Sequence, residues 1–353
     1  MKLKSSSTKA KTFSSSIERF SLNKKGSLLF FVIFAGIGSA LLIISHAATP
    51  TTSIEPETAA ISSPAVTGTD SNASGGSYVQ FKAVAANCTA GNIMNIVAHE
   101  DDDILFMNPD ILHDVQVANF CVTTVYLTNG DDNLGNTYAL SRETGAKAAY
   151  AYMASQPNNW LPDSFNIVDS AGVAHTMSGF TMRGQSRISL IFMRLPDGNV
   201  DGSGFSDGGF TSLMKLWLST IPSMTSTNGD SYTDDTIKDV LTKLMTKFQP
   251  NHLNIQDYVG AFGDGDHADH HAGAYYAELA SRAYTTPHTL TGYLDYLVAS
   301  HPANIVGTDL NLKYNTWFSY TPYDSQVCQN MTACSADPNY GNWLQRQYLA
   351  GVE

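Results

Sequence analysis

Short apolar runs alternate with helical patterns from Asn92 onward, and this alternation is the feature that most constrains the fold. Residues 93–98 and 122–128 are short, apolar and rich in β-branched side chains, which is typical of strands buried on both faces of a parallel sheet. The Ala-rich segment 138–155 has the composition of a helix and would cross back over the sheet after the second strand. This order predicts an α/β fold with a mainly parallel sheet.

The same alternation continues downstream. Residues 165–168 and the segment from Val173 flank a Gly-containing turn and predict a hairpin, and residues 188–193 predict another core strand. The clearest helix spans 234–248, where apolar residues recur every three or four positions. Residues 253–256 follow as the next strand, so the α/β interpretation extends over most of the chain.

Ionisable residues gather directly after the first predicted strand and again far downstream. His99 is followed at once by the acidic run 100–103, and the segment 266–271 holds His267 and His270 at the start of a helix-forming region. An acidic run is more often a solvated loop, and close histidines can decorate a surface. However, ligands of open α/β sheets collect beyond the carboxyl ends of the strands, so we expect the two clusters to meet there.

Together the clusters supply the donor set of a catalytic zinc site. Such a site takes three protein ligands from His, Asp and Glu and leaves one position for water. His99, Asp102 and His270 form a set of two histidines and one carboxylate. Zinc lowers the pKa of its bound water to about 7, which yields a hydroxide nucleophile. Asp101 suits a general base for that water, and His267 is free to face the substrate.

Two other classes of function stay open. A non-catalytic glycan-binding protein could keep the metal as a structural element, although the presence of Asp101 argues for an enzyme. A metal-dependent esterase or phosphoesterase could use the same ligands. Phosphate chemistry favours a second metal or several basic residues, and the motifs offer only Arg142 and Arg194.

At these motifs the chain resembles the zinc-dependent N-deacetylases of the LmbE/PIG-L family. The family signatures are Ala-His-Pro-Asp-Asp after the first strand and His-x-Asp-His downstream, which stand here as residues 98–102 and 267–270. Glu100 replaces the usual proline, a change expected to affect loop rigidity but not the metal site. The resemblance covers about residues 92–283. Further matches are Leu127-Thr128-Asn129-Gly130-Asp131 and Arg142-Glu143.

The resemblance implies a Rossmann-like, mainly parallel sheet with helices on both faces. It implies His99, Asp102 and His270 as the zinc ligands. It also implies Asp101 as the general base and His267 as the group that stabilises the oxyanion or protonates the leaving amine. The implied reaction is hydrolysis of an N-acetyl group from an N-acetylglucosamine-type sugar or glycoconjugate, which releases acetate and a free amine.

Two residues are candidates for contact with the substrate. The resemblance implies such a contact for Arg142. Asp257 lies at the end of a predicted strand and could contact a sugar hydroxyl, but a structural hydrogen-bonding role is equally open.

The amino-terminal segment 27–45 carries no charge and is long enough to cross a hydrocarbon core. Seven basic residues precede it, so the positive-inside tendency leaves the amino terminus in the cytoplasm and the rest outside. The alternative is a signal peptide cleaved near Ala47. The predicted divisions are a basic segment 1–26, an anchor or signal 27–45, a Ser/Thr/Pro/Gly-rich linker 46–90, a deacetylase domain 91–325 and a carboxyl-terminal extension 326–353.

Charge argues against nucleic acid as a partner. The chain has 20 basic and 32 acidic side chains, and the first 46 residues hold seven basic residues and one acidic residue. The remainder therefore has 13 basic and 31 acidic side chains, a net charge of −18. Such a surface repels a phosphate backbone.

Four cysteines fit an oxidising compartment. Cys88 and Cys121 each precede a predicted strand, so parallel neighbouring strands would bring them within bridging distance. Cys328 and Cys334 would close a small loop. Four cysteines allow three pairings, of which this one is the most local.

Overall fold

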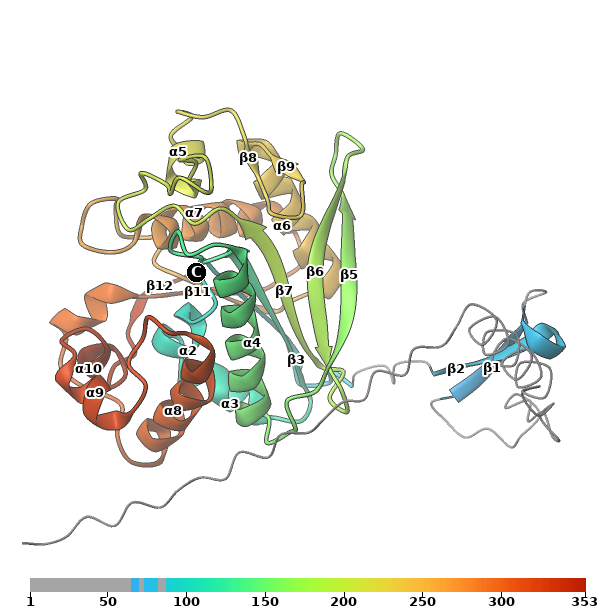
Figure 1. Ribbon diagram of the computed structural model, residues 1–353, viewed down its shortest axis with the longest axis horizontal. Helices are drawn as coiled ribbons and strands as arrows, with labels where there is room; N and C mark the ends of the chain where they lie inside the picture. The colour runs from blue at the N-terminus through green and yellow to red at the C-terminus, as the bar shows by residue number, and fades with distance from the viewer. Residues whose placement is uncertain (1–64, 70–72, 82–86) are drawn as a thin grey trace, which may run out of the picture. The chain divides into compact units, whose positions relative to one another are not determined.

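The computed structural model describes residues 65–69, 73–81 and 87–353 (Figure 1). The chain forms two units, Met1–Lys82 and Ala83–Glu353. In the first unit, β1 (Ala65–Thr69) pairs antiparallel with β2 (Ser77–Phe81) after a 3₁₀ turn, η2 (Ser74–Gly76). The predicted anchor or signal segment 27–45 lies outside the described residues. No helix within the described ranges has the length and apolar character needed to span a bilayer.

The second unit is built on an eight-stranded sheet with the order β12-β11-β10-β3-β4-β7-β6-β5. Its five central strands, β11 to β7 in that order, are parallel, and β12, β6 and β5 join antiparallel at the edges. The prediction of a mainly parallel sheet is confirmed. The strands are β3 (Gly91–Val97), β4 (Phe120–Thr128), β5 (Trp160–Val168), β6 (Ala174–Met182), β7 (Ile188–Leu195), β10 (His252–Ile255), β11 (Thr289–Tyr293) and β12 (Leu349–Val352). A separate two-stranded ribbon pairs β8 (Met224–Thr225) with β9 (Ser231–Tyr232).

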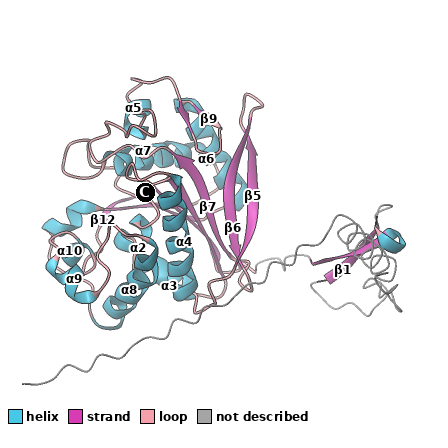
Figure 2. Ribbon diagram, viewed as in Figure 1, coloured by secondary structure: helices cyan, strands magenta, loops and turns pink. Residues whose placement is uncertain are grey.

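Helices cover both faces of this sheet (Figures 1 and 2). One hydrophobic cluster joins the sheet to α2, α3, α4 and α8, and a second cluster joins the opposite face to α5, α6 and α7. The helices are α2 (Asp102–Phe106), α3 (Asp110–Gln116), α4 (Asn136–Met153), α5 (Leu213–Trp217), α6 (Asp234–Phe248), α7 (Ala268–Ala283), α8 (Gly307–Tyr320), α9 (Met331–Ala336) and α10 (Tyr340–Trp343), with 3₁₀ turns η3 (Tyr296–Ser300) and η4 (Thr321–Tyr323).

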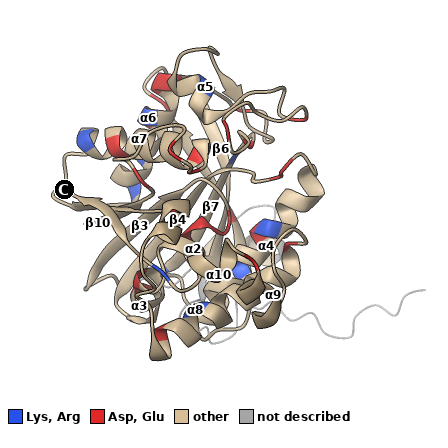
Figure 3. Ribbon diagram, turned by 90° about the vertical axis from the view of Figure 1, so that its left-hand side faces the viewer, with Lys and Arg blue, Asp and Glu red and all other residues tan. Residues whose placement is uncertain are grey.

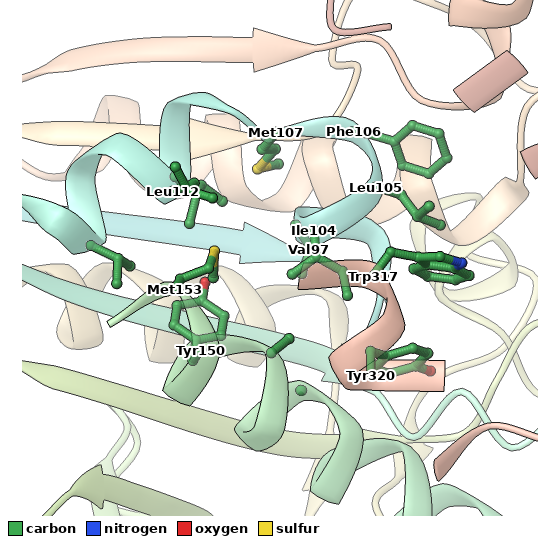
Figure 4. Close-up of a cluster of buried hydrophobic side chains, with 14 of the residues drawn as sticks. Val97, Ile104, Leu105, Phe106, Met107, Leu112, Tyr150, Met153, Trp317 and Tyr320 are labelled. Atoms are coloured by element: carbon green, nitrogen blue, oxygen red, sulfur yellow. The ribbon is translucent and has the colours of Figure 1, made fainter. Parts of the chain in front are cut away.

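The sequence pattern of β3 accounts for its place between the two layers of helices. Along β3, Ile93 and Val97 pack into the first cluster, whereas Met94 and Ile96 pack into the second. This alternation follows the two-residue period of a strand and explains why the run is apolar throughout. Figure 4 shows the first cluster, in which the α2 side chains lie near Trp317 of α8.

Helix α6 begins and ends where its sequence predicts. The side chain of Thr233 accepts a hydrogen bond from the Thr236 backbone N–H and caps the first turn. Gln249 adopts a left-handed conformation at the end, directly before Pro250. The face made by Ile237, Val240, Leu241, Leu244 and Met245 is buried in the second cluster.

Parallel pairing brings several strand ends to one edge of the sheet. Ile96 of β3 lies opposite Val125 of β4 and Ile255 of β10, so these three strands end at the same level. Residues that follow them therefore share one rim, as expected for an open α/β sheet.

The structure contains both disulfides expected from the sequence. Cys88 and Cys121 are bridged with a Cα–Cα distance of 5.2 Å, at the starts of the paired strands β3 and β4. Cys328 and Cys334 are bridged at 5.0 Å and close a loop next to α9.

The two disulfides should contribute unequally to stability, because they span 33 and 6 residues of sequence. Loop-closure entropy gives about 4 kcal/mol for the longer loop and about 2 kcal/mol for the shorter. We expect the pair Cys88→Ala/Cys121→Ala to lower the free energy of unfolding more than Cys328→Ala/Cys334→Ala. Urea unfolding of both variants measures the difference, and an equal or reversed order would contradict this account.

Candidate metal centre and active site

The centre of the site is the Asp102 carboxylate, which lies between two imidazole rings. Its Oδ2 accepts a hydrogen bond of 2.7 Å from the His99 backbone N–H and lies 3.2 Å from His99 Nδ1. Its Oδ1 lies 3.1 Å from His270 Nε2. His99 follows β3, Asp102 begins α2 and His270 lies in the first turn of α7, so the two predicted clusters do meet.

The outer nitrogens of both rings face other carboxylates. His270 Nδ1 lies 2.8 Å from Asp266 Oδ1, and His99 Nε2 lies 3.7 Å from Asp269 Oδ2 and 4.0 Å from Asp197 Oδ1. Each histidine therefore turns one nitrogen to Asp102 and the other to an outer carboxylate. Metal-ligating histidines are oriented in this way by outer carboxylates, which fix the ring and the tautomer.

This arrangement fits a bound cation. When His270 donates its Nδ1 proton to Asp266, its Nε2 lone pair faces the Asp102 carboxylate, and Nε2 is buried without a hydrogen bond among the described residues. Two electron-pair donors that face each other in a buried site need a proton or a metal ion between them. His99, Asp102 and His270 are thus candidate ligands of a metal ion.

His267 lies beside this centre with a defined tautomer. It is the N-cap of α7, and its Nδ1 accepts a 3.1 Å hydrogen bond from the Asp269 backbone N–H. A neutral His267 therefore carries its proton on Nε2. Its ring centroid is 4.6 Å from that of His99 and 5.1 Å from that of His270, and one nitrogen of each ring lies within 4.8 Å of the others.

The charges in the centre balance one another. Burial opposes protonation of His99, but the negative charge of Asp102 and hydrogen bonds outweigh it and raise the His99 pKa to about 10. Burial also lowers the pKa of His270, but the negative charge of Asp102 outweighs this effect and raises that pKa well above its usual range. These two rings hold the pKa of Asp102 well below its usual range despite burial. A bound metal would take the place of the protons that the rings otherwise carry.

His267 behaves differently from the other two histidines. Burial, together with the neighbouring charges of His99 and His270, lowers its pKa well below 6.5. The ring is therefore neutral at physiological pH and presents an Nε2 proton.

Asp101 is held by the buried guanidinium of Arg142. Nη2 of Arg142 donates to Asp101 Oδ1, Nη1 donates to the Gly130 carbonyl at 2.5 Å, and Nε donates to Tyr320 Oη at 2.8 Å. The Asp324 carboxylate lies 3.1 Å from Nε. Arg142 lines the cavity, but these contacts direct its donors to the protein and make it a positioning group for Asp101.

Burial raises the pKa of Asp101 to about 6, although the positive charge of Arg142 opposes the shift. A carboxylate with this pKa is ionised at neutral pH and can accept a proton there. Asp101 thus meets the requirement for a general base.

Glu100, the neighbour of Asp101 that replaces the family proline, is fully buried. Its Oε2 lies 3.7 Å from Arg142 Nη1, and neither carboxylate oxygen makes a hydrogen bond among the described residues. Burial raises its pKa to about 8. Gly130 makes room for it, because a Cβ there would lie 2.4 Å from Glu100 Oε2 and the residue has a φ of +50°.

A cavity of about 570 Å³ opens above the centre. His99, Asp101, Asp102 and His267 reach it from the loops after β3 and before α7. Another part of its lining comes from the carboxyl-terminal part of the chain and includes Tyr296, Asp324, Val327, Tyr340 and Trp343.

Asp257, the second candidate substrate contact, is not among the residues that line this cavity. Its Oδ1 accepts hydrogen bonds from the backbone N–H groups of Val259 and Gly260, at 2.8 and 2.9 Å, and its side chain is buried. The structure thus gives it the structural role that the sequence left open.

Several residues of the site escaped the sequence analysis. Asp197 lies near His99, and Asp295 Oδ2 lies 3.9 Å from His270 Nδ1. The two carboxylates follow the ends of β7 and β11, so the strand-end signal that identified His99 could have found them. Asp324, Tyr340 and Trp343 lie in a segment with no motif that points to the site.

Fold and site together define an α/β protein with a candidate metal centre of two histidines and one aspartate at the carboxyl edge of its sheet. The sequence profile of the PIG-L family, described as GlcNAc-PI de-N-acetylase, matches residues 94–281, more than half of the chain. The protein belongs to this family.

Solved structures to which the chain is similar include the zinc-inhibited form of teicoplanin deacetylase Orf2, with 12% identity, 65% of this chain and 84% of that chain covered and a TM-score of 0.39. They also include N,N'-diacetylchitobiose deacetylase from Pyrococcus horikoshii, with 15% identity, coverage of 74% and 83% and a TM-score of 0.39. A third is GalB, the 4-carboxy-2-hydroxymuconate hydratase from Pseudomonas putida KT2440, with 11% identity, coverage of 66% and 83% and a TM-score of 0.35. Comparison with curated protein sequences gave no match.

Removal of the carboxylate behind His270 tests the metal centre. Asp266→Asn should weaken zinc affinity about 10- to 100-fold, as loss of an outer-shell carboxylate does, because the ring loses its charged partner. A competition titration with a chromophoric chelator measures this. The matched control is Asp169→Asn, which alters the buried pair with His175 on the β5–β6 hairpin, 3.2 Å apart. Equal affinities of the two variants would argue against the proposed ligand set.

Proposed function

We propose that this protein is a zinc-dependent amidohydrolase that removes the N-acetyl group from an N-acetylglucosamine-type sugar or glycoconjugate. The observation that carries the proposal is the Asp102 carboxylate shared between His99 and His270, with Asp101 and His267 on the cavity side of the same centre. Family membership supports the reaction type, because the family is described as a de-N-acetylase.

Separate residues of this chain have separate roles in the proposed amide hydrolysis. When bound, zinc would supply a Lewis acid that polarises the amide carbonyl and lowers the pKa of water. Asp101 accepts the proton of the attacking water, and Arg142 fixes the orientation of its carboxylate through Oδ1.

His267 presents its Nε2 proton to the other side of the reacting amide. Because Nδ1 is engaged by the Asp269 backbone, Nε2 is the atom that donates a hydrogen bond to the developing oxyanion. The proton that Asp101 takes from the water passes to the leaving nitrogen, so that the sugar departs as an amine. The products are acetate and the free amine of the sugar.

Replacement of Asp101 by Asn should lower kcat for acetate release about 10²- to 10⁴-fold, because the base is lost while the ligands stay in place. The base must be ionised, so wild-type kcat/KM should fall as the pH drops through about 6. A bound metal that stabilises the carboxylate would move this decline to a lower pH. The residual kcat/KM of Asp101→Asn should not show this decline at acidic pH.

Acetate release from N-acetylglucosamine and chitooligosaccharides, with zinc and with chelator, provides the measurement. Zinc content of the variant is the control and should equal that of wild type. If the wild type releases acetate only from acetyl esters, or if Asp101→Asn retains full activity with bound zinc, the proposed reaction or its base is wrong.

We also propose that the enzyme works outside the cytoplasm, either anchored through residues 27–45 or secreted after cleavage near Ala47. The two disulfides support this location, because structural disulfides persist in oxidising compartments. Alkylation of free thiols in intact cells tests it. The full chain should contain no free thiol, whereas a chain lacking residues 1–46 should keep reduced cysteines. Free thiols in the full chain would contradict the location.

A further inference from the structure

The cavity above the metal centre is strongly acidic. Arg142 is the single Lys or Arg among the described residues that line it. In Figure 3 acidic segments lie in the loops beside α2. The carboxylates that line the cavity are Asp101, Asp102, Asp132, Asp197 and Asp324.

Besides Asp102, two of these carboxylates have no Lys or Arg partner among the described residues. Asp102 would be balanced by a metal, and Arg142 contacts Asp101 and Asp324. Asp197 lies 4.0 Å from His99 but pairs with no Lys or Arg among the described residues, and neither does Asp132. The unbalanced negative charge therefore lies on the side of the cavity formed by the loops after β4 and β7.

These two loops are joined to each other. The Asp132 backbone N–H donates to Asp197 Oδ2 at 3.2 Å, and Asp197 Oδ1 accepts from the Asn199 backbone N–H at 2.9 Å. Asp132 is exposed and has a φ of +45°, a conformation that asparagine also tolerates. The hydrogen bond thus fixes the backbone of residue 132, whose exposed carboxylate lines the cavity.

The part of the lining that comes from the carboxyl-terminal segment holds three aromatic residues, which form an aromatic wall. Tyr296 and Trp343 stack at a centroid distance of 4.5 Å and an interplanar angle of 12°, and Tyr340 lies edge-on to Trp343 at 5.2 Å. The Tyr296 ring lies 5.0 Å from the His270 ring, so this wall borders the metal centre directly. All three aromatic residues lie outside the family match, which ends at residue 281.

This aromatic wall is firmly supported. Buried Lys313 of α8 donates to the Trp343 and Arg346 carbonyls at 3.2 and 2.8 Å, and the Cys328–Cys334 disulfide closes the neighbouring loop. Aromatic rings offer apolar area to the C–H face of a sugar, and carboxylates accept hydrogen bonds from its hydroxyl and amine groups. The same carboxylates repel an anion.

We propose that this cavity selects glycan substrates by charge: the sugar linked to the reacting N-acetylglucosamine is neutral or carries a free amine, and anionic conjugates are excluded. This inference rests on the proposed deacetylase function and adds a substrate class to it. Asp132 and Asp197 provide the charge selection, and Tyr296 provides the surface on which the sugar lies.

Three disaccharides test the charge selection. They share an N-acetylglucosamine and differ in the second sugar, which is N-acetylglucosamine, glucosamine or glucuronic acid. Titration calorimetry of the zinc-loaded full chain should show binding at least about tenfold weaker for the uronate compound than for the neutral one, with the amine compound equal or tighter. Higher ionic strength should narrow these differences, because the selecting charge of Asp132 is exposed.

Asp132→Asn should narrow the ratio of neutral to anionic affinity about two- to fivefold, the size expected for one solvent-screened charge. The matched control is Asp163→Asn, an exposed carboxylate on β5 that does not line the cavity, and it should leave the ratio as in wild type. Tyr296→Leu should weaken binding of all three disaccharides about tenfold, whereas Tyr296→Phe should restore it. Thermal unfolding of each variant separates these effects from misfolding.

The binding measurement tests the charge selection, and the hydrolysis measurement tests the proposed reaction. If the affinities follow the expected order but no acetate is released, the selection stands and the proposed reaction fails. If acetate is released but the uronate compound binds and reacts as well as the neutral one, the selection is overturned and the reaction stands.

Discussion

The site depends on one constraint, the burial of the Asp102 carboxylate between the rings of His99 and His270. A carboxylate and two imidazoles that meet away from water must share protons or a cation, or the desolvation cost is not offset. This requirement joins the loop after β3 to the first turn of α7, two segments about 170 residues apart in the chain. It also explains the outer carboxylates, because Asp266 and Asp269 stabilise the positive charge that gathers around the centre.

The parallel sheet makes this convergence possible. Strands β3, β4 and β10 end at one level, so their following loops need no long excursions to reach the same rim. The loop after β7 comes close for a specific reason. The Gly198 N–H donates to Asp269 Oδ2 at 2.7 Å, and a Cβ at position 198 would lie 2.3 Å from the other oxygen of that carboxylate. The backbone of one loop thus orients a carboxylate that faces His99.

The parts of the molecule that were predictable from the sequence are those encoded locally. The apolar period of α6 predicted its bounds, and the apolar run of β3 predicted a strand that is buried on both faces. His99, Asp102 and His270 stand in short motifs next to such elements, so their meeting followed from sheet topology. The contacts of Arg142 could not be predicted in this way, because its partners Tyr320 and Asp324 lie about 180 residues away and no local sequence pattern indicates them. The same holds for β12, which pairs with β11 at the sheet edge through residues that show no strand period.

This division has a physical consequence for how the chain is organised. The proposed metal ligands and the proposed base lie within the family match at residues 94–281, whereas the aromatic wall and Asp324 come from the segment beyond it. The two parts are not independent, because Asp324 accepts hydrogen bonds from Tyr320 at 2.7 Å and Tyr138 at 2.5 Å and faces the guanidinium that holds Asp101. A change in the carboxyl-terminal segment can therefore reshape the cavity wall at Tyr340 or Trp343 without touching the base. A change at Asp324 acts on the proposed base through Arg142, because that guanidinium contacts both carboxylates.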